Sequence, residues 1–509
     1  MSSTLSSAEV MLVSPQQASS PKKRRITPSP ESSVSKKLLI ISPITQVQPQ
    51  PLVAPSSFSN GLVANLFPRN GAIIELRRPL CLQHAHPDPR PQLPETPQPD
   101  LPVSRQIIFD FDLRTTPSKF LEHDGNKLLL EVFPGAHRVE FDDRVLVYHF
   151  KKLPSKPWPK KIAGVPCYLT DNENDFGPSI PIHRRSLSRI AVSDHLNLRD
   201  NEAAVDLVFN LVKDFFVDKS ISITEIQFWG HVVIIVLEDA NEDNLSRVPC
   251  SVAQCNCFYL FEQEMCRPRS LSALRRQAIS VSGGQIDNSQ YEVMRPGVIL
   301  SSGKHPEEGI EILTSSGVLI KDNFGAKFMT VAAHGFPGPP FDGQVYHPSH
   351  AGTRIGEVIM ELTHTDISLV KLDEGMEFNN EPFENTIIPA PPFKFAGFSR
   401  AAETRIGDHI FLDSPFAGFL EGTKLSHALL RVPSDDPLEP EQTWIRCQWD
   451  YMGQGSSEAI VDGICGSPIW GRNHEVIGFF RYAPTSGVFV DCCLVVAADH
   501  LLDKGYSML

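Results

Sequence analysis

The pattern of hydrophobic and polar residues changes at about residue 105. Residues 1–104 show no sustained periodicity and hold 17 of the 43 prolines, together with abundant serine, threonine and glutamine. Such a segment buries too little apolar surface to offset the conformational entropy that folding would cost. We therefore predict a disordered, Pro/Ser-rich tail over residues 1–104 and folded protein beyond it.

Residues 105–280 combine strand patterns with helical ones. Residues 127–133 and 139–150 alternate as strands do, with a Pro-Gly turn between them. Apolar residues at helical spacing over 203–216, with Asn201 as an N-cap, predict an amphipathic helix. Residues 221–237 return to a strand pattern with a turn at Gly230, and 271–279 predicts a second short helix. We expect an α+β domain over 105–280 without assigned chemistry, then a polar linker over 281–295.

Three stretches within residues 296–509 carry residues suited to chemistry. An apolar run over 328–333 ends at His334, which indicates a strand leading into a turn that presents the imidazole. Asp366 opens an alternating strand. Cys465 lies in Asp-Gly-Ile-Cys-Gly-Ser-Pro, where flanking glycines allow a sharp turn and close approach of a substrate. The amides of Gly463 and Cys465 could then point together at a developing oxyanion.

These stretches resemble the three signature blocks of chymotrypsin-like peptidases of the PA clan: Thr-Ala-Ala-His, Asp-Ile-Ala-Leu and Gly-Asp-Ser-Gly-Gly-Pro. The separations also fit, at 366 minus 334, or 32 residues, and 465 minus 366, or 99 residues. Residues 315–320 resemble the segment that opens the first barrel of this superfamily. The resemblance covers about residues 296–509 and implies a trypsin-like, all-β pair of six-stranded antiparallel barrels, with a peptide-binding groove between them.

Departures from the family pattern carry information. Cys465 stands where the serine enzymes have serine, and Gly-x-Cys-Gly-Ser-Pro is similar to viral cysteine proteases of this fold, particularly the nuclear-inclusion protease of potyviruses. Those enzymes carry a glutamine-reading histidine at the place of Phe480, so a glutamine preference is not implied here. Ile464 replaces the aspartate that pairs with a freshly cut N-terminus in secreted members, so zymogen cleavage is not expected.

The resemblance implies an intracellular endopeptidase with a cysteine nucleophile, Cys465, a general base, His334, and an orienting carboxylate, Asp366. By the family motif, Ala459 lies at the base of the pocket for the residue before the cut, and Arg481 lies on its wall or points to solvent. Two alternatives stay open. The fold could persist as a catalytically inactive, protein-binding scaffold, or the same residues could hydrolyse an ester or thioester.

The composition argues against several other kinds of protein. The formal net charge of -13 argues against general nucleic-acid affinity. The longest aliphatic run, 232–237, is far too short for a membrane span, and no signal peptide begins the chain, so we expect a nuclear or cytoplasmic protein that is not secreted. Ten cysteines without Cys-x-x-Cys pairs indicate reduced thiols, and we expect no metal and no cofactor. Two basic clusters at bipartite spacing predict a nuclear localisation signal that binds importin: Lys22, Lys23, Arg24, Arg25, Lys36 and Lys37.

Overall fold

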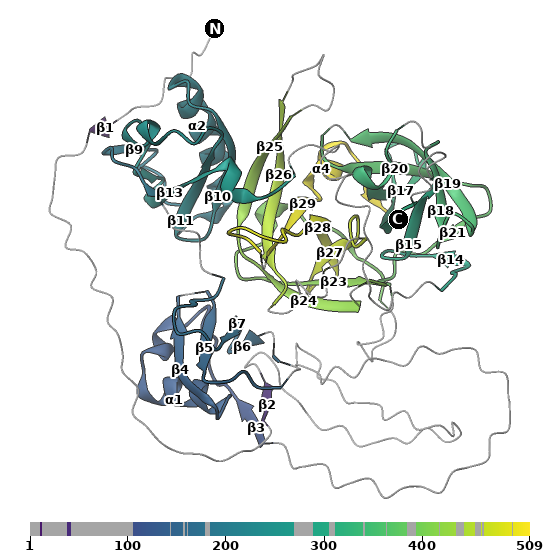
Figure 1. Ribbon diagram of the computed structural model, residues 1–509. Helices are drawn as coiled ribbons and strands as arrows, with labels where there is room; N and C mark the ends of the chain where they lie inside the picture. The colour runs from purple at the N-terminus through teal and green to yellow at the C-terminus, as the bar shows by residue number, and fades with distance from the viewer. Residues whose placement is uncertain are drawn as a thin grey trace, which may run out of the picture. The chain divides into compact units, whose positions relative to one another are not determined.

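The computed structural model describes residues 105–509, together with 11–12 and 38–41. Gaps fall at 143, 156–157, 160, 179–183, 269–288, 305–310, 339–341, 363, 384–392, 417, 434–441, 454–459, 461–462 and 491. Most of the expected tail, both basic clusters, the helix expected over 271–279, most of the expected linker and Ala459 lie outside the described residues. The chain forms two compact units, one holding Arg25–Gly177 and the other holding Pro178–Glu384 and Phe393–Leu509 (Figure 1).

The smaller unit packs one helix against a four-stranded sheet of order β4-β5-β7-β6. Its core joins residues of the sheet to Leu129 of the helix, and Tyr148 donates a hydrogen bond to the Leu129 carbonyl at 3.1 Å. The elements are β3 (Arg105–Ile108), which pairs with β2 (Leu38–Ile41), a 3₁₀ turn (Pro117–Phe120), α1 (His123–Glu131), β4 (Ala136–Phe141), β5 (Leu146–Phe150), β6 (Lys161–Ile162) and β7 (Val165–Thr170).

Helix α1 corrects one prediction, because residues 127–131 belong to it and not to a strand. The run Lys-Leu-Leu-Leu-Glu has no β-branched residue, and its members are good helix formers. Gly125 and Leu129, four positions apart, form the buried face. The expected turn before β4 is confirmed, since the Ala136 amide donates to the Phe133 carbonyl at 2.9 Å.

The larger unit begins with a helix-and-sheet module over residues 178–268. The predicted helix is confirmed as α2 (Val205–Asp218), although a 3₁₀ turn (Glu202–Ala204) precedes it and the Asn201 side chain makes no capping bond. The hairpin at Gly230 is confirmed by β10 (Ile223–Phe228) and β11 (Val232–Leu237). The other strands are β8 (Arg184–Arg185), β9 (Ile190–Val192), which also pairs with β1 (Met11–Leu12), β12 (Ser251–Val252) and β13 (Cys255–Phe261).

A closed six-stranded barrel follows. Its order is β15-β18-β19-β20-β17-β16, and pairing of β15 with β16 closes it. These strands are β15 (Ile299–Lys304), β16 (Glu311–Lys321), β17 (Lys327–Ala332), β18 (Gln344–His347), β19 (Thr353–Leu362) and β20 (Ile367–Leu372). A short parallel pair, β14 (Val293–Met294) and β21 (Glu377–Phe378), flanks it, and β30 (Ser507–Met508) adds to the edge of β16.

The remaining strands belong to a mixed 15-stranded sheet. Six of them pair in a closed cycle, β23-β24-β26-β29-β28-β27. The elements are β22 (Gly397–Phe398), β23 (His409–Ser414), β24 (Gly418–Lys424), β25 (His427–Pro433), β26 (Gln442–Tyr451), β27 (Pro468–Gly471), β28 (Glu475–Tyr482), β29 (Cys492–Ala497) and α4 (Asp499–Asp503). Strand β25 also pairs with β10, so backbone hydrogen bonds join the module to these strands.

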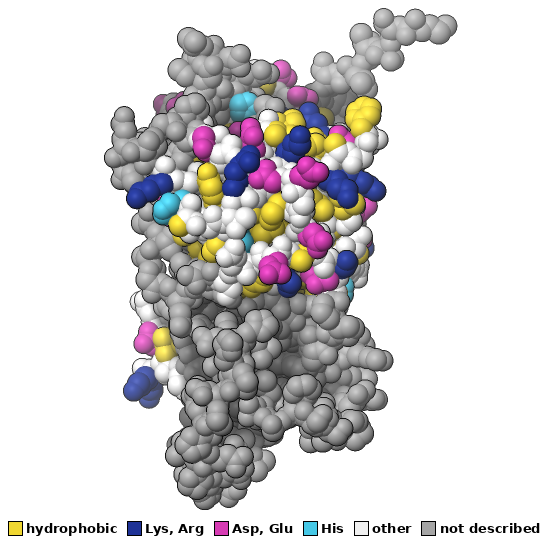
Figure 2. All heavy atoms as spheres, turned by 90° about the vertical axis from the view of Figure 1, so that its right-hand side faces the viewer, with side chains coloured by type: hydrophobic (Ala, Val, Ile, Leu, Met, Phe, Trp, Pro, Cys, Tyr) yellow, Lys and Arg dark blue, Asp and Glu magenta, His cyan; other side chains and the backbone are white. Residues whose placement is uncertain are grey.

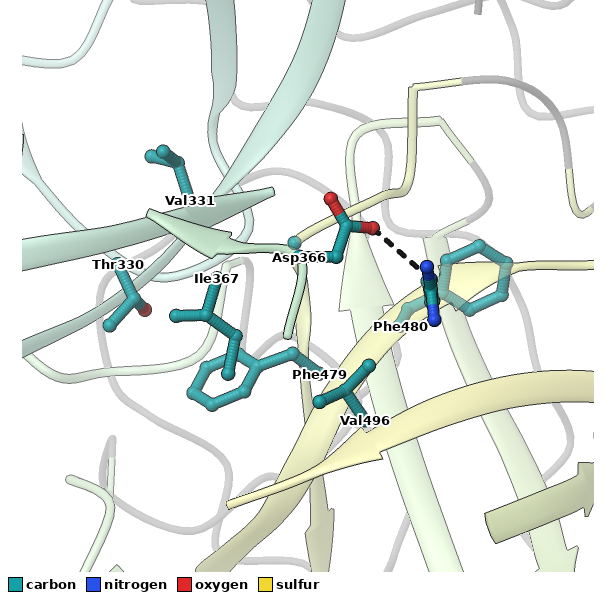
Figure 3. A pocket seen from close by; sticks show the side chains of 9 residues that line it. Thr330, Val331, Asp366, Ile367, Phe479, Phe480 and Val496 are labelled. Carbon is teal, nitrogen blue, oxygen red and sulfur yellow. Dashed lines mark ion pairs between the residues drawn. The ribbon is translucent and has the colours of Figure 1, made fainter. Parts of the chain in front are cut away.

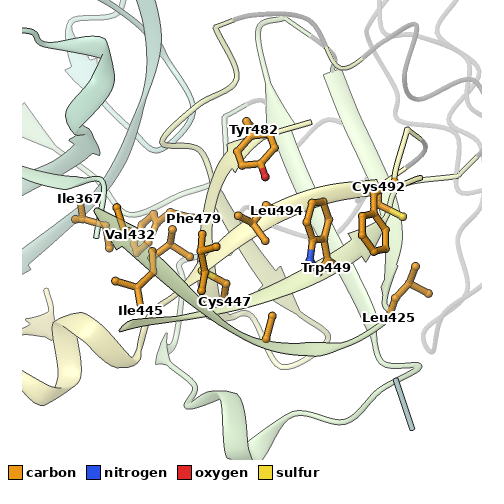
Figure 4. Packing of buried hydrophobic residues seen from close by; sticks show 14 of the residues in the cluster. Ile367, Leu425, Val432, Ile445, Cys447, Trp449, Phe479, Tyr482, Cys492 and Leu494 are labelled. Carbon is orange, nitrogen blue, oxygen red and sulfur yellow. The ribbon is translucent and has the colours of Figure 1, made fainter. Parts of the chain in front are cut away.

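One hydrophobic cluster runs through the larger unit. It includes Trp229 from the module and Leu369 from the closed barrel. Trp449 and Leu494, from β26 and β29, also belong to it (Figure 4). Since burying a large apolar side chain contributes roughly 1.5–3 kcal/mol, this shared core stabilises the three parts together. The α+β segment expected over 105–280 therefore spans both units, with its later part built into the larger one.

The described surface is mixed in character. On the face shown in Figure 2, basic and acidic side chains are interspersed among hydrophobic ones. Among the described residues, no helix combines the length and the apolar character that a membrane crossing requires.

Candidate active site

His334 owes its position to strand pairing. Strand β17 pairs antiparallel with β20, so that Ala332 faces Ile367, and the next residues on each chain are also neighbours. The Ala333 amide donates to the Asp366 carbonyl at 3.0 Å, and a 3₁₀ turn, Ala333–Gly335, then directs the imidazole inward. The side chain of His334 is 2% exposed.

Asp366 contacts His334 at three points. One carboxylate oxygen, Oδ1, accepts the His334 backbone amide at 2.9 Å, and the imidazole Nδ1 lies 3.0 Å from Oδ1 and 2.8 Å from Oδ2. The backbone of Asp366 has a φ of 65°, in the left-handed region that aspartate tolerates better than most residues. Thr365 secures this turn, because its hydroxyl donates to the Leu362 carbonyl at 2.6 Å.

Cys465 lies in a turn just before β27. Strand β16 of the closed six-stranded barrel holds this turn in place. Its carbonyl accepts the Thr314 hydroxyl at 2.6 Å and the Ser315 amide at 3.0 Å. The Ser315 hydroxyl donates to the Gly463 carbonyl at 2.9 Å. Gly466 has a φ of 87°, and a Cβ there would lie 2.7 Å from the Ser315 carbonyl oxygen. Strand β16 and the cysteine turn thus fit together only with glycine at position 466.

The electrostatics link the three side chains. Burial alone would lower the pKa of His334, but the charges of Asp366 and Cys465, with side-chain hydrogen bonds to both, raise it to about 10. The raised pKa favours the cationic form of the imidazole. The structure brings together His334, Asp366 and Cys465, which lie far apart in the sequence.

Two amides beside the sulfur have no acceptor. Within the described part of the chain, neither the Gly463 amide nor the Cys465 amide donates a hydrogen bond to a protein group. Gly463 has a φ of 106°, which only glycine adopts readily, and a Cβ at this position would lie 2.4 Å from the Phe416 ring.

Arg481 lies beside the same carboxylate. The side chain is 1% exposed, and its Nε is 3.5 Å from Asp366 Oδ2, the ion pair that is dashed in Figure 3. In the thiol form of Cys465, the sulfur donates a hydrogen bond to the Arg481 carbonyl at 3.2 Å. Arg481 and Asp366 also line a cavity of about 10 Å³, together with Thr330, Val331, Ile367, Gly466, Phe479, Phe480 and Val496.

The structure adds residues that the sequence patterns did not indicate. The sequence patterns give no sign that Thr314 binds the Cys465 carbonyl. Arg481 contacts Asp366 and does not point to solvent. Phe480 and Ile464 both pack in the core of the second set of strands. Ala459 is outside the described residues. Among the residues that the structure describes, no group of three or more His, Cys, Asp or Glu side chains could hold a metal.

No protein-family model matches the chain, and no curated protein matches it. Solved structures do match at low identity. A glutamic acid-specific serine protease that uses a histidine triad in substrate binding is 13% identical, covering 42% of this chain and 100% of that one, with a TM-score of 0.30. A protease from M. tuberculosis in its active form is 14% identical, covering 44% and 92%, with a TM-score of 0.29.

A further match is Cellulomonas bogoriensis chymotrypsin, which is 14% identical and covers 43% of this chain and 99% of its own length, with a TM-score of 0.29. All three TM-scores are below 0.5.

Proposed function

We propose that the chain is a cysteine endopeptidase that cleaves peptide bonds with Cys465, His334 and Asp366. The observation that supports this most strongly is the convergence of three groups in one row. Asp366 binds His334 Nδ1 at 2.8 Å, and Cys465 makes a side-chain hydrogen bond that raises the pKa of His334. With Nδ1 bound to the carboxylate, Nε2 is the nitrogen that remains for the thiol.

In the acylation step, the Cys465 sulfur attacks the carbonyl carbon of the peptide and forms a C–S bond. The carbonyl oxygen takes the negative charge, and we assign its stabilisation to the amides of Gly463 and Cys465, which donate to no acceptor among the described residues. His334, which holds the thiol proton, then gives it to the leaving amine as the C–N bond breaks. Asp366 keeps the imidazole in the required tautomer and supports its cationic form.

In the second step, water hydrolyses the thioester that remains on Cys465. His334 takes a proton from the water, the C–S bond breaks, and the sulfur recovers this proton through the imidazole. The acid product leaves, and the site returns to its starting state. Apart from water and the peptide, both steps use groups of this chain.

The second candidate is an inactive scaffold that binds protein ligands through the same fold. It would need Cys465 to behave as an ordinary packed thiol. The buried His–Asp pair and the left-handed backbone of Asp366 favour the enzyme, because each of them is costly to a fold that gains nothing from it.

Alkylation by iodoacetamide at about pH 6.5 separates the two candidates. An ordinary thiol is about 1% ionised there, whereas a thiolate paired with imidazolium is largely ionised. Cys266, the exposed thiol of the described residues, is an internal standard. Peptide mapping should show Cys465 reacting about 10–100 times faster than Cys266.

His334→Ala should reduce the reaction of Cys465 to the rate of Cys266, because no imidazolium is left. His350→Ala is the matched control, since His350 also binds a carboxylate, Glu311, at 2.7 Å, but is 40% exposed and away from the sulfur. Peptide hydrolysis should follow the same order. Equal rates for Cys465 and Cys266 in the wild-type protein would leave only the scaffold.

A further inference from the structure

Arg481 is the extra residue of a β-bulge. In the ladder between β28 and β29, Phe480 faces Val495 and Tyr482 faces Leu494, so Arg481 has no partner position. A bulge of this kind redirects a side chain, and bulges are common beside active sites. Here, it directs the arginine side chain toward Asp366 while its backbone carbonyl faces Cys465.

Burial of the Arg481 guanidinium is unfavourable for the stability of the folded protein. The side chain is 1% exposed, and none of its three nitrogens donates a hydrogen bond to another described residue. A buried charge without hydrogen bonds is destabilising unless an opposite charge compensates it. The compensating group is Asp366, at 3.5 Å. Replacing both members of a buried ion pair by apolar residues is often neutral or stabilising, so stability alone does not explain why this pair is present.

The other groups around Arg481 carry no compensating charge. Burial raises the pKa of Cys447, on β26, to about 12, and burial also raises the pKa of Tyr482, so both are neutral at physiological pH. Beyond Tyr482, the cation Arg267 is itself paired with Glu225 and Glu262.

We propose, on the premise of the function above, that Arg481 is a positioning residue of the thiol site. Arg481 contacts both outer members of the set Cys465, His334 and Asp366. Its carbonyl lies at the Cys465 sulfur, and its guanidinium lies at the Asp366 carboxylate. Its charge cancels that of Asp366, so the sulfur and imidazole exchange their proton in neutral surroundings. This role replaces contact with the substrate, which the sequence pattern had suggested for the arginine.

The net charge around Cys465 and His334 determines the direction in which the pH profile for alkylation should move when Arg481 is replaced. Without the guanidinium, the site carries one uncompensated negative charge, which favours proton uptake by both the thiolate and the imidazole. In Arg481→Met, both limbs of the pH profile for alkylation of Cys465 should therefore move to higher pH. A single charge at this range typically moves a titration by about one unit. Arg481→Lys keeps the charge and should restore the profile, at least in part.

A matched control and a second readout distinguish positioning from packing and from substrate contact. Arg431→Met, on β25, removes a cation that is paired with Glu238, directly after β11, and should leave the pH profile unchanged. The ratio of cleavage after glutamate to cleavage after alanine in otherwise identical peptides should be the same in the wild type and in Arg481→Met. Guanidinium-induced unfolding of each variant verifies that it is folded.

The outcomes separate this proposal from the proposed function. A wild-type Cys465 that reacts no faster than Cys266 overturns the peptidase. A fast Cys465 with an unmoved profile in Arg481→Met overturns only the role of Arg481. A changed glutamate-to-alanine ratio with an unmoved profile would return Arg481 to the substrate pocket.

Discussion

The raised pKa of His334 makes the stability of the larger unit depend on pH. The folded-state pKa is about 10, against an ordinary value of 6.5. A raised pKa means that the folded state binds the proton more tightly than the unfolded state does. The stabilisation is therefore complete below about pH 6.5 and is lost as the pH rises through about 10. Each pKa unit corresponds to about 1.4 kcal/mol, so the whole effect is on the order of 5 kcal/mol.

The perturbation is His334→Gln, which removes the titrating group and keeps a side chain that can hydrogen-bond. The assay is denaturant unfolding followed by tryptophan fluorescence, because Trp449 and Trp470 lie in the core shared by the larger unit. Groups other than Cys465 contribute equally to both proteins, so the difference in unfolding free energy reports His334 together with Cys465. In the proposed ion pair, the proton that folding adds to His334 is matched by the proton that folding removes from Cys465 up to about pH 8.5. The difference should therefore shrink by about 1 kcal/mol per pH unit between about pH 8.5 and 10.

A difference that stays constant over this range would refute the reasoning. It would mean that the imidazole is not held as a cation by Asp366 and Cys465, and the proposed ion pair would fail with it. A difference that shrinks already below about pH 7 would indicate that Asp366 alone supports the imidazole weakly.

Two further substitutions test how the cysteine turn is held. Gly466→Ala would place a Cβ 2.7 Å from the Ser315 carbonyl oxygen at a positive φ, so alkylation of Cys465 should slow at least tenfold and the melting temperature should fall. Gly471→Ala is its matched control, because nothing lies within 4 Å of a Cβ there, and a similar loss in both variants would contradict the argument. Thr314→Val removes the 2.6 Å hydrogen bond to the Cys465 carbonyl and should lower kcat for peptide hydrolysis more than it raises KM. Unchanged kinetics in this variant would mean that the Ser315 amide alone positions the turn.

Much of the frame around the site could be predicted from the sequence. The strand expected over 328–333 is confirmed as β17, and residues 315–320, which resemble the segment that opens the first barrel, belong to β16. Residues 328–333 are apolar except for one threonine, a pattern typical of a buried strand. The family blocks indicated His334, Asp366 and Cys465, and the fold places these residues together. Strands and motif residues could be predicted because each of them is determined by residues that are close together in the sequence.

The rest depends on contacts between distant residues. Thr314 meets Cys465 across 151 positions, and no local pattern encodes such a contact. The direction of Arg481 depends on a bulge set by how β28 and β29 pair, whereas strict alternation would have sent the side chain elsewhere. The prediction of a strand over 127–133 is wrong at the residues of α1, because three consecutive leucines fit a strand pattern as well as a helical one.

The module over residues 178–268 is part of the structure that holds the proposed site. Its strand β10 pairs with β25 along four residues, and Trp449 of β26 donates to buried Glu225 of β10 at 2.8 Å. Phe489, in the segment after β28, is stacked between Trp449 at 4.5 Å and Trp229 of the module at 5.6 Å. Without the module, β25 would become an open edge and one face of Phe489 would lose its partner. The segment that continues from Arg481 therefore takes its shape partly from the module, and the smallest unit able to present the proposed site begins well before residue 296.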